Sequence, residues 1–205
     1  MEIMKYILIA LVSYLLGSIN FSILISRFTK AQDIRNYGSG NAGFTNTLRT
    51  FGAKAAIFAF GGDILKGVAS AVFALLLVGQ QGAYIAWIFC ILGHMYPVFF
   101  KFKGGKGIVV SLAHALAIDW VMALVLLSIF FVFFLVKRYV SMGSIVAIAF
   151  LPVYVAFISG KNWFIIICAL LIAVFVVCTH NKNIVRILKG TESVIDLKRI
   201  SWNKK

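Results

Sequence analysis

The stretch GSGNAGFTNTLR, residues 38–49, lies between two long apolar runs at residues 4–26 and 53–78. It contains three glycines, one serine, two threonines, two asparagines and one arginine, and it has no carboxylate. Glycine lets a backbone turn sharply and approach a ligand closely, because it has no Cβ. Hydroxyl, amide and guanidinium groups supply hydrogen-bond donors, and arginine adds a two-pronged cation. This combination predicts a loop that binds an anion, in particular a phosphate, between two membrane-spanning helices.

The composition around this loop indicates an integral membrane protein. Of 205 residues, 62% are hydrophobic and 13% are charged, and the mean hydropathy is +1.00. A soluble domain is about half apolar and about a quarter charged. The chain has two prolines and no linker rich in glycine or serine. We therefore predict one integral membrane domain over residues 1–205.

The apolar runs predict an all-α fold, a polytopic membrane helical bundle with about seven transmembrane helices. The predicted spans are residues 4–26, 53–78, 83–100, 107–118, 120–136, 140–159 and 163–178. A turn at Asp119 and Trp120 is needed, because the apolar run over 108–136 is too long for one straight crossing. Five spans, with two of these runs fused or buried, remain an alternative. Either number leaves the three polar loops on one side of the membrane.

The formal net charge of +14 is distributed unevenly along this topology. Cytoplasmic segments hold 17 of the 20 Lys and Arg residues, because only Lys5 and Lys161 fall outside and Lys66 falls within a span. Basic residues accumulate on the cytoplasmic side of membrane proteins, so we expect no nucleic-acid partner. The amino terminus is predicted outside and the carboxyl terminus inside. The polar loops then face the cytoplasm, at the bacterial cytoplasmic (inner) membrane.

A second polar loop, KFKGGKG at residues 101–107, has three lysines and three glycines ahead of a predicted helix. Backbone N–H groups at the start of a helix, with lysine nearby, form an anion site. The loop is not a nucleotide P-loop, because its glycine spacing differs and Ile108 stands where serine or threonine would hold magnesium. Contact with anionic lipid headgroups is the alternative. That alternative accounts for the lysines but not for the glycines.

A third polar segment, HNKNIVRILKGTE, covers residues 180–192. His180 and Asn183 are three residues apart and therefore share one face of a helix. His180 has the chemistry of a base, or of a donor to a phosphate or carbonyl oxygen. The alternative is a polar cap at the membrane boundary. Glu192 is the one carboxylate of this segment, and we expect it to pair with a loop cation.

Asp63 and Lys66 lie one turn apart inside the second predicted span, where an ionisable pair is costly and usually faces the protein interior. A structural ion pair and a supporting role at the functional site are both open. His94 and His114 are predicted to be structural. The sequence has no HxxxH pattern, no carboxylate cluster and no His–Cys set. We therefore predict no metal and no cofactor.

Together these segments resemble the bacterial membrane glycerol-3-phosphate acyltransferases that use acyl phosphate as the donor. The matching stretches are GSGNAGFTNTLR (38–49), DILKG (63–67), GHMYPVFFKFKGGKG (93–107) and HNKNIVRILKGTE (180–192). The resemblance implies transfer of a fatty acyl group from acyl phosphate to the 1-hydroxyl of sn-glycerol 3-phosphate, in the first step of bacterial phospholipid synthesis. Lysophosphatidic acid and phosphate are the implied products. Membrane lipids, and a functional link to the enzyme that makes acyl phosphate, are the other implied partners.

The resemblance also assigns roles to individual residues. Catalytic roles fall on Ser39 and Arg49 of the first stretch and on His180 and Asn183 of the third, and Glu192 has a more structural role. The substrate-binding candidates are Gly38, Gly40, Asn41, Thr45, Asn46, Lys103, Gly104, Gly105, Lys106 and Gly107. The supporting candidates are Asp63 and Lys66.

A mechanism follows from the chemistry of the implied donor. Acyl phosphate is a mixed anhydride with a good leaving group, so the protein need mainly orient the hydroxyl and stabilise developing charge. We expect Lys106 and Arg49 to hold phosphates, while Ser39, His180 and Asn183 position the reacting oxygens. Either His180 or a substrate phosphate takes the hydroxyl proton. No acyl-Ser39 intermediate is expected.

Two other functions are compatible with parts of the sequence. A transporter or flippase for an anionic solute is favoured only by the charged pair in the second span, and no internal repeat supports it. A basic scaffold that binds anionic lipid would not need Ser39 or His180.

The HxxxxD motif of other glycerolipid acyltransferases is absent as a functional unit. His114 and Asp119 have its spacing, but the predicted topology puts them near the opposite face.

Overall fold

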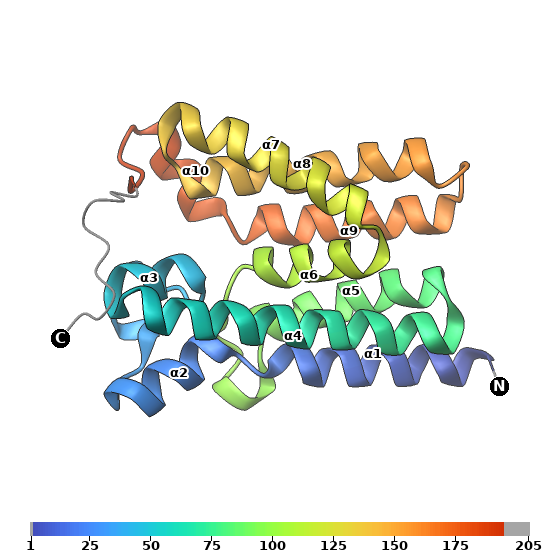
Figure 1. Cartoon of the computed structure of the whole chain (residues 1–205), viewed down its shortest axis with the longest axis horizontal. Coiled ribbons are helices and arrows are strands. Elements are labelled where there is room, and N and C mark those ends of the chain that lie inside the picture. Colours follow the sequence, from blue (N-terminus) through green and yellow to red (C-terminus); the bar gives the residue numbers. More distant parts are fainter. Residues whose placement is uncertain (1, 195–205) are drawn as a thin grey trace.

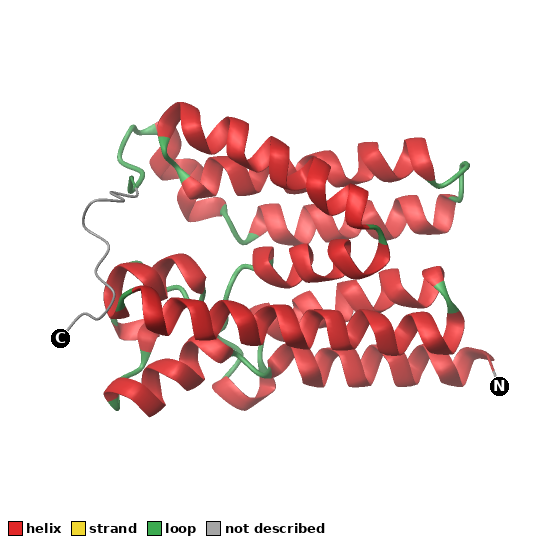
Figure 2. Cartoon of the chain, in the orientation of Figure 1, coloured by secondary structure: helices red, strands yellow, loops and turns green. Residues whose placement is uncertain are grey.

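A computed structural model describes residues 2–194 of the chain, and its regular elements in that range are all helices (Figures 1 and 2). The all-α prediction is therefore confirmed. The predicted outside position of Met1 and the predicted cytoplasmic basic tail beyond residue 194 fall outside the described residues.

The α-helices are α1 (Glu2–Ser18), α2 (Phe21–Lys30), α3 (Phe44–Phe51), α4 (Ala53–Val78), α5 (Gln80–Met95), α6 (Ile108–Ile118), α7 (Trp120–Lys137), α8 (Val140–Ile158), α9 (Trp163–Cys178) and α10 (Asn181–Leu188). Two short 3₁₀ helices, η1 (Ile34–Asn36) and η2 (Val98–Phe100), lie in the loops after α2 and α5. The predicted turn between the fourth and fifth apolar segments is confirmed, since α6 ends at Ile118 and α7 begins at Trp120.

The first predicted span is broken, which the sequence prediction of one continuous run over 4–26 missed. Helix α1 ends at Ser18, and Asn20 then caps α2 by accepting a 3.0 Å hydrogen bond from the Ile23 N–H. The Asn20 amide also donates to the Ala42 carbonyl at 3.2 Å. Asparagine offers the backbone an alternative to helical hydrogen bonds, so it favours a helix start over a helix interior.

The number of membrane crossings is not fixed by helix length. Five segments are long and apolar enough to cross: Glu2–Thr29, Ala53–Val78, Gln80–Phe100, Trp120–Lys137 and Val140–Ile158. A sixth arises if Trp163–Cys178 and Asn181–Leu188, bent by 61°, count as one span. Ile108–Ile118 is apolar but shorter. Each of the seven predicted apolar segments contains helix, although the first breaks after Ser18 and the α-helix of the third ends at Met95, before η2. Their crossing of the membrane remains a prediction.

The helices form two groups. Helices α1, α4 and α5 pack together, α7, α8 and α9 form the second group, and α6 packs against α4, α5 and α7 between them (Figure 1). Glycine permits the closest of these contacts: a Cβ on Gly17 would lie 2.1 Å from the Cys90 carbonyl oxygen, and one on Gly93 would lie 2.2 Å from that of Tyr14. Small residues at a crossing let two membrane helices pack backbone to backbone.

Helices α2, α3 and α10 lie at one end of the bundle, opposite the end where α1 begins (Figure 1). Two of the predicted polar segments, residues 38–49 and 180–192, include α3 and α10. The fold therefore gathers them at the end of the bundle away from the start of α1.

Candidate active site

A pocket of about 500 Å³ unites the three polar segments. Its polar lining comes from Ser39, Asn41, Thr45, Asn46, Arg49, Asp63, His94, Lys106, Ser111, Ser141, Ser144, His180, Asn183, Arg186 and Glu192. Its apolar lining includes five residues of α7, namely Leu126, Leu127, Phe130, Phe131 and Phe134. The lining from the three polar segments is thus polar and cationic, and we call it the cationic wall. The lining from α7 is apolar and partly aromatic, and we call it the apolar wall.

The first polar loop is shaped by Asn46, whose side chain is buried. Its Oδ1 accepts from the Ser39 N–H at 2.9 Å, and its Nδ2 donates to the carbonyls of Tyr37 and Asn41 at 2.9 and 3.0 Å. Gly38 has φ +58°, and a Cβ there would lie 2.3 Å from Asn46 Oδ1. Asn46, which the sequence places among the substrate ligands, therefore uses its amide to fold the loop that presents Ser39.

Gly40 lies outside the pocket lining, as does Gly38. Gly40 has φ +73°, a left-handed conformation that favours glycine. Both glycines therefore act on the shape of the loop. Asn41 and Thr45 do line the pocket, as the sequence predicts for substrate contact.

Arg49 reaches the pocket from the last turn of α3. Its Nη2 donates to the Ser193 carbonyl at 3.1 Å, which joins the first polar loop to the segment after α10. Burial lowers the pKa of Arg49 from its ordinary value, while the negative charge of Glu192 opposes that effect and the positive charge of Arg186 adds to it. The guanidinium thus belongs to the same electrostatic cluster as the third polar segment.

Lys106 is the part of the second loop that enters the pocket as a charge. Its ammonium donates a short hydrogen bond to Asn183 Oδ1. Burial lowers its pKa to about 8, Glu192 opposes the decrease, and the charges of Arg186 and Arg49 increase it. Three cations thus share one carboxylate here. The cluster is net positive and favours an anion.

Gly104 and Gly105 serve the packing of the second loop. The N–H groups of Gly104 and Gly105 donate to the carbonyls of Met95 and His94, both at 3.0 Å. A Cβ on Gly105 would lie 2.2 Å from His94 Nε2, and one on Gly104 would lie 2.0 Å from the His94 carbonyl oxygen. Lys103 is exposed, and none of these three loop residues lines the pocket. Lys106 and Gly107 are the predicted loop residues that do.

Glu192 holds the third segment together. Its Oε1 accepts from Ser141 Oγ and from Asn183 Nδ2, and its Oε2 accepts from Arg186 Nε, all at 2.7 Å. The predicted pairing of Glu192 with a loop cation is thus confirmed. Burial alone would raise the pKa of this carboxyl, but the hydrogen bonds from Ser141, Arg186 and Asn183 lower it. Ser141 comes from α8, and nothing in the sequence near residue 141 pointed to this contact.

His180 lies at the N-terminal end of α10, buried against the pocket. Its Nδ1 is 2.8 Å from the Val176 carbonyl oxygen. A carbonyl only accepts hydrogen bonds, so Nδ1 carries the proton and Nε2 of the neutral ring keeps its lone pair. This tautomer suits a proton acceptor.

Asp63 and Lys66 form a buried ion pair at 2.8 Å. The Lys66 ammonium also donates to the carbonyls of Gly17 and Ile19, at 3.1 and 2.6 Å, and lies 2.9 Å from His94 Nδ1. The break after α1 leaves these carbonyls without helical partners, and Lys66 supplies them with donors. Asp63 lines the pocket, whereas Lys66 does not. The pair therefore stabilises the broken helix next to the pocket.

His94 was predicted to be structural, and it both joins this ion pair and lines the pocket. His114 and Asp119 have separate roles. His114 is buried, and Asp119 caps α7 while accepting from the Tyr154 hydroxyl at 2.7 Å. Within residues 2–194, no three His, Cys, Asp or Glu side chains are grouped so as to hold a metal ion.

Comparison with known proteins gives one consistent family. The sequence profile described as glycerol-3-phosphate acyltransferase matches residues 7–190. The glycerol-3-phosphate acyltransferase of Clostridioides difficile (strain 630) is 41% identical, over 97% of this chain and 100% of that protein. The glycerol-3-phosphate acyltransferase of Thermoanaerobacter pseudethanolicus (strain ATCC 33223 / 39E) is 40% identical, over 95% of this chain and 98% of that protein.

Two solved structures share the fold. One is the crystal structure of PlsY, an integral membrane glycerol 3-phosphate acyltransferase, in its glycerol 3-phosphate form. Its TM-score is 0.87 and its identity 36%, covering 93% of this chain and 96% of that chain. The lysophosphatidic acid form of PlsY has a TM-score of 0.83 and an identity of 34%, covering 93% of this chain and 95% of that chain.

Proposed function

The chain belongs to the glycerol-3-phosphate acyltransferase family, and from this premise we propose that it transfers a fatty acyl group from acyl phosphate to the 1-hydroxyl of sn-glycerol 3-phosphate. It is an acyltransferase, and the transporter or flippase alternative is not favoured. The products are lysophosphatidic acid and phosphate. The observation that carries the proposal is the union of a cationic wall and an apolar wall in one pocket.

The apolar wall suits the acyl chain of the donor. The side chains of Phe130, Phe131 and Phe134 lie along one helix and line the pocket beside Leu126 and Leu127. Burying apolar surface is favourable by about 25 cal/mol per Å². When the acyl chain lies along α7, its carbonyl carbon is therefore directed toward the cationic wall.

The cationic wall suits the phosphates. Both substrates carry a phosphate group, and Lys106, Arg49 and Arg186 surround the single carboxylate of Glu192. Lys106 holds the phosphate of glycerol 3-phosphate, because the family resemblance associates the second loop with that substrate, and Arg49 holds the phosphate of acyl phosphate. Asn183, which was assigned a catalytic role, contributes by orienting Lys106. Its amide oxygen accepts from Lys106, and its amide nitrogen donates to Glu192. It therefore aims the Lys106 ammonium.

The reaction is a substitution at the acyl carbon. The 1-hydroxyl oxygen of glycerol 3-phosphate attacks the carbonyl carbon and forms the new ester bond. The bond from that carbon to the phosphate oxygen breaks, and phosphate leaves with the electron pair. The hydroxyl proton goes to Nε2 of His180 or to the leaving phosphate, and the Ser39 hydroxyl donates to a reacting oxygen.

The site works at a membrane boundary. The protein is an integral membrane protein with several apolar helices. The proposed setting is the bacterial inner membrane, with the amino terminus outside and the pocket open to the cytoplasm, as the distribution of Lys and Arg favours. Residues 1–205 act as one domain. The donor comes from a separate enzyme that makes acyl phosphate, with which this protein is functionally linked.

The test is reconstitution of the purified full-length chain with acyl phosphate and labelled glycerol 3-phosphate, in buffer without added metal. Formation of labelled lysophosphatidic acid and phosphate in equal amounts is the expected result. Absence of lysophosphatidic acid would overturn the proposal. Product formed from an acyl thioester but not from acyl phosphate would retain the acyltransferase and refute the donor. Trapping of an acyl-Ser39 enzyme would refute direct transfer.

A further inference from the structure

The turn that leads into the Lys106 loop contains two strained residues. Lys101 and Phe102 both have φ +57°, in the left-handed region that residues other than glycine rarely adopt. Such a conformation is strained and persists only where surrounding contacts enforce it. Both side chains are exposed, so their own packing does not hold this conformation.

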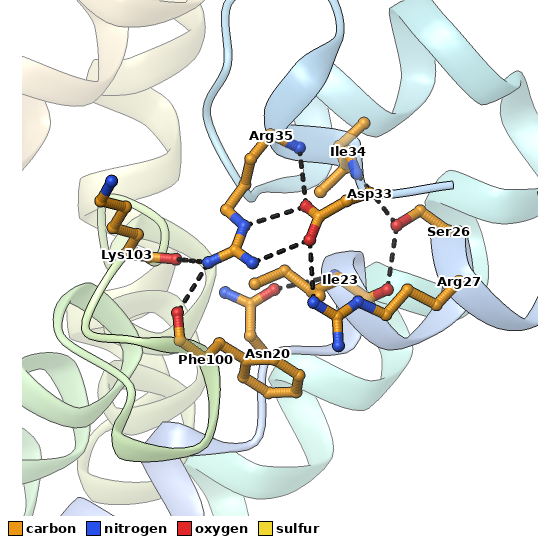
Figure 3. Close-up of polar contacts among 9 residues, drawn as sticks. All are labelled: Asn20, Ile23, Ser26, Arg27, Asp33, Ile34, Arg35, Phe100 and Lys103. Atoms are coloured by element: carbon orange, nitrogen blue, oxygen red, sulfur yellow. Dashed lines mark hydrogen bonds and ion pairs between the residues drawn. The ribbon is translucent and has the colours of Figure 1, made fainter. Parts of the chain in front are cut away.

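Arg35 bridges the turn from outside the pocket. Its Nη1 donates to the carbonyl oxygen of Phe100 at 2.7 Å and to that of Lys103 at 3.1 Å (Figure 3). These two carbonyls flank the strained pair on either side. One guanidinium nitrogen thus closes the turn between the end of η2 and the start of the glycine-rich loop.

Asp33 fixes the guanidinium of Arg35 in place. Its Oδ1 accepts from Arg35 Nε at 2.9 Å, and its Oδ2 accepts from Arg35 Nη2 at 2.7 Å, a bidentate pair (Figure 3). Arg27 Nη2 donates to the same Oδ2 at 2.9 Å. The hydrogen bond from Arg35 is the main cause that holds the pKa of Asp33 well below its usual range. Such charge-assisted pairs are about twice as strong as neutral hydrogen bonds.

The pair is itself anchored to α2 and, through the Asn46 amide, which donates to the Ile34 carbonyl at 3.4 Å, to the first polar loop. The Ser26 hydroxyl accepts from the Ile34 N–H at 3.1 Å and donates to the Ile23 carbonyl at 2.9 Å. The Arg27 guanidinium lies over the Phe100 ring, 5.5 Å from its centroid. The two polar loops are therefore joined through α2 and η1, whose residues do not line the pocket.

We propose that Arg35, oriented by Asp33, is a positioning residue that sets the Lys106 loop relative to the Ser39 loop. Neither residue lines the pocket, so each acts through the backbone of residues 100–103. The inference rests on the proposed function, which gives Lys106 a phosphate of glycerol 3-phosphate. Loss of the bridge lets the strained turn relax, and the Lys106 ammonium then leaves its position beside Asn183.

The substitutions separate positioning from simple charge. Arg35→Lys keeps the positive charge but loses the fork that contacts Asp33 and both carbonyls. Arg35→Gln loses both the positive charge and the fork. Asp33→Asn keeps the size of the side chain and weakens the bidentate pair. Arg138→Gln is the matched control, because it removes an exposed arginine from the turn after α7.

Steady-state kinetics of the full chain supply the first measurement. Arg35→Lys and Arg35→Gln are expected to raise the KM for glycerol 3-phosphate about 10-fold or more, from the loss of charge-assisted hydrogen bonds. The KM for acyl phosphate is expected to stay near the wild-type value. Asp33→Asn should have a smaller effect in the same direction, and Arg138→Gln none. A wild-type KM for glycerol 3-phosphate in Arg35→Lys would overturn the proposal, as would an equal rise in both KM values.

Hydrogen exchange without substrate supplies the second measurement and does not depend on the activity. The amides of Gly104 and Gly105 should exchange faster in the Arg35 variants and in Asp33→Asn than in the wild type, while those of α8 and α9 are unchanged. Unchanged exchange at the two glycines would overturn the inference. The proposed function fails separately, by absence of lysophosphatidic acid in the wild type. If Arg35→Gln fails to fold, Arg35→Lys and Asp33→Asn carry both measurements.

Discussion

The side-chain amide nitrogen of Asn183 donates to the carboxylate of Glu192 over 2.7 Å. The oxygen of the same amide accepts from Lys106, so Asn183 connects the cation of the second loop to the carboxylate of the third segment. An amide has a donor end and an acceptor end, and both are used here. The orientation of Lys106 therefore depends on Glu192, although the two side chains share no hydrogen bond among those described.

Removal of the Glu192 carboxylate should reduce both stability and activity. In Glu192→Ala, the buried donors of Ser141 and Asn183 lose their acceptor, at about 1–3 kcal/mol for a buried unsatisfied group. Thermal unfolding in detergent measures the loss. Thr191→Ala, at an exposed neighbouring position, is the control and should unfold like the wild type. Equal stability of Glu192→Ala and the control would contradict the prediction.

The same carboxylate should make stability depend on pH. The pKa of Glu192 is lowered from its ordinary value of 4.5, so the folded state binds its proton more weakly than the unfolded state. Its stabilising contribution to folding is therefore complete above pH 4.5 and is lost as the pH falls through the lowered pKa. Unfolding temperatures between pH 7 and pH 3 should fall more steeply for the wild type than for Glu192→Gln. Parallel curves would show that Glu192 is not the group responsible.

Lys106 should give the reaction an alkaline limit. Its pKa is lowered to about 8, so it loses its proton at a lower pH than an ordinary lysine, and the neutral amine no longer attracts phosphate. The value of kcat/KM for glycerol 3-phosphate reports the free enzyme and should fall about tenfold per pH unit above that point. Arginine stays charged, so Lys106→Arg should lack this decline. Superimposable pH profiles of the two proteins would rule out Lys106 as the titrating group.

Replacement of His180 decides which group takes the hydroxyl proton. If Nε2 accepts the proton, His180→Ala should lower kcat by about 10²- to 10⁴-fold, the usual size of general base catalysis, with little change in the KM for glycerol 3-phosphate. Asn181→Ala, exposed at the next position, is the control and should keep wild-type kcat. A near wild-type kcat in His180→Ala would assign the proton to the leaving phosphate.

The buried ion pair should matter for stability more than for chemistry. Lys66→Met leaves the Asp63 charge unpaired and the carbonyls after α1 without a donor, and the expected loss is about 3–5 kcal/mol. The double change Asp63→Asn and Lys66→Met should recover part of that loss. Lys54→Met, exposed on the same helix, is the control, with an effect of about 0.5 kcal/mol or less. A double variant less stable than Lys66→Met would contradict this account.

Two glycines should respond differently to alanine. A Cβ on Gly105 would lie 2.2 Å from His94 Nε2 and 2.6 Å from the Ala42 carbonyl oxygen, whereas a Cβ on Gly61 would meet nothing within 4 Å. Gly105→Ala should therefore displace the second loop and raise the KM for glycerol 3-phosphate. Gly61→Ala should keep wild-type kinetics and gain about 0.5–1 kcal/mol of helix stability. Equal kinetics for the two variants would refute the packing role of Gly105.

Much of the fold and of the candidate site could be predicted from the sequence, because it depends on residues that are close together in the chain. Apolar runs long enough to cross a bilayer predicted the helices, and the excess length of the apolar run over 108–136 predicted the break before α7. Glu192 was expected to pair with a loop cation because it is the one carboxylate in a basic segment, and Arg186 is that cation. The family was predicted from the order of the motifs and is confirmed.

Other features depend on contacts between segments far apart in the chain. The first span breaks at Asn20, whose amide donates a hydrogen bond to the Ala42 carbonyl. A single asparagine in an apolar run does not predict which distant residue it will contact. Ser141 meets Glu192 from α8. Gly104 and Gly105 lie outside the pocket lining and pack the second loop, while Asn46 both lines the pocket and folds the first loop. The sequence does not show these contacts, since glycine and asparagine serve binding and packing equally well.

The sequence by itself determined that the chain is a helical membrane protein, which polar segments are candidates for the chemistry, and which family it resembles. Each of these follows from composition, period and motif, which are properties of neighbouring residues. Only the tertiary structure decided which residues of each segment reach the pocket, which tautomer His180 holds, and how Arg35 contacts the turn that leads into the Lys106 loop. Those outcomes depend on distances and directions of hydrogen bonds between segments as much as 144 residues apart, as for Arg49 and Ser193, and chain order does not specify them.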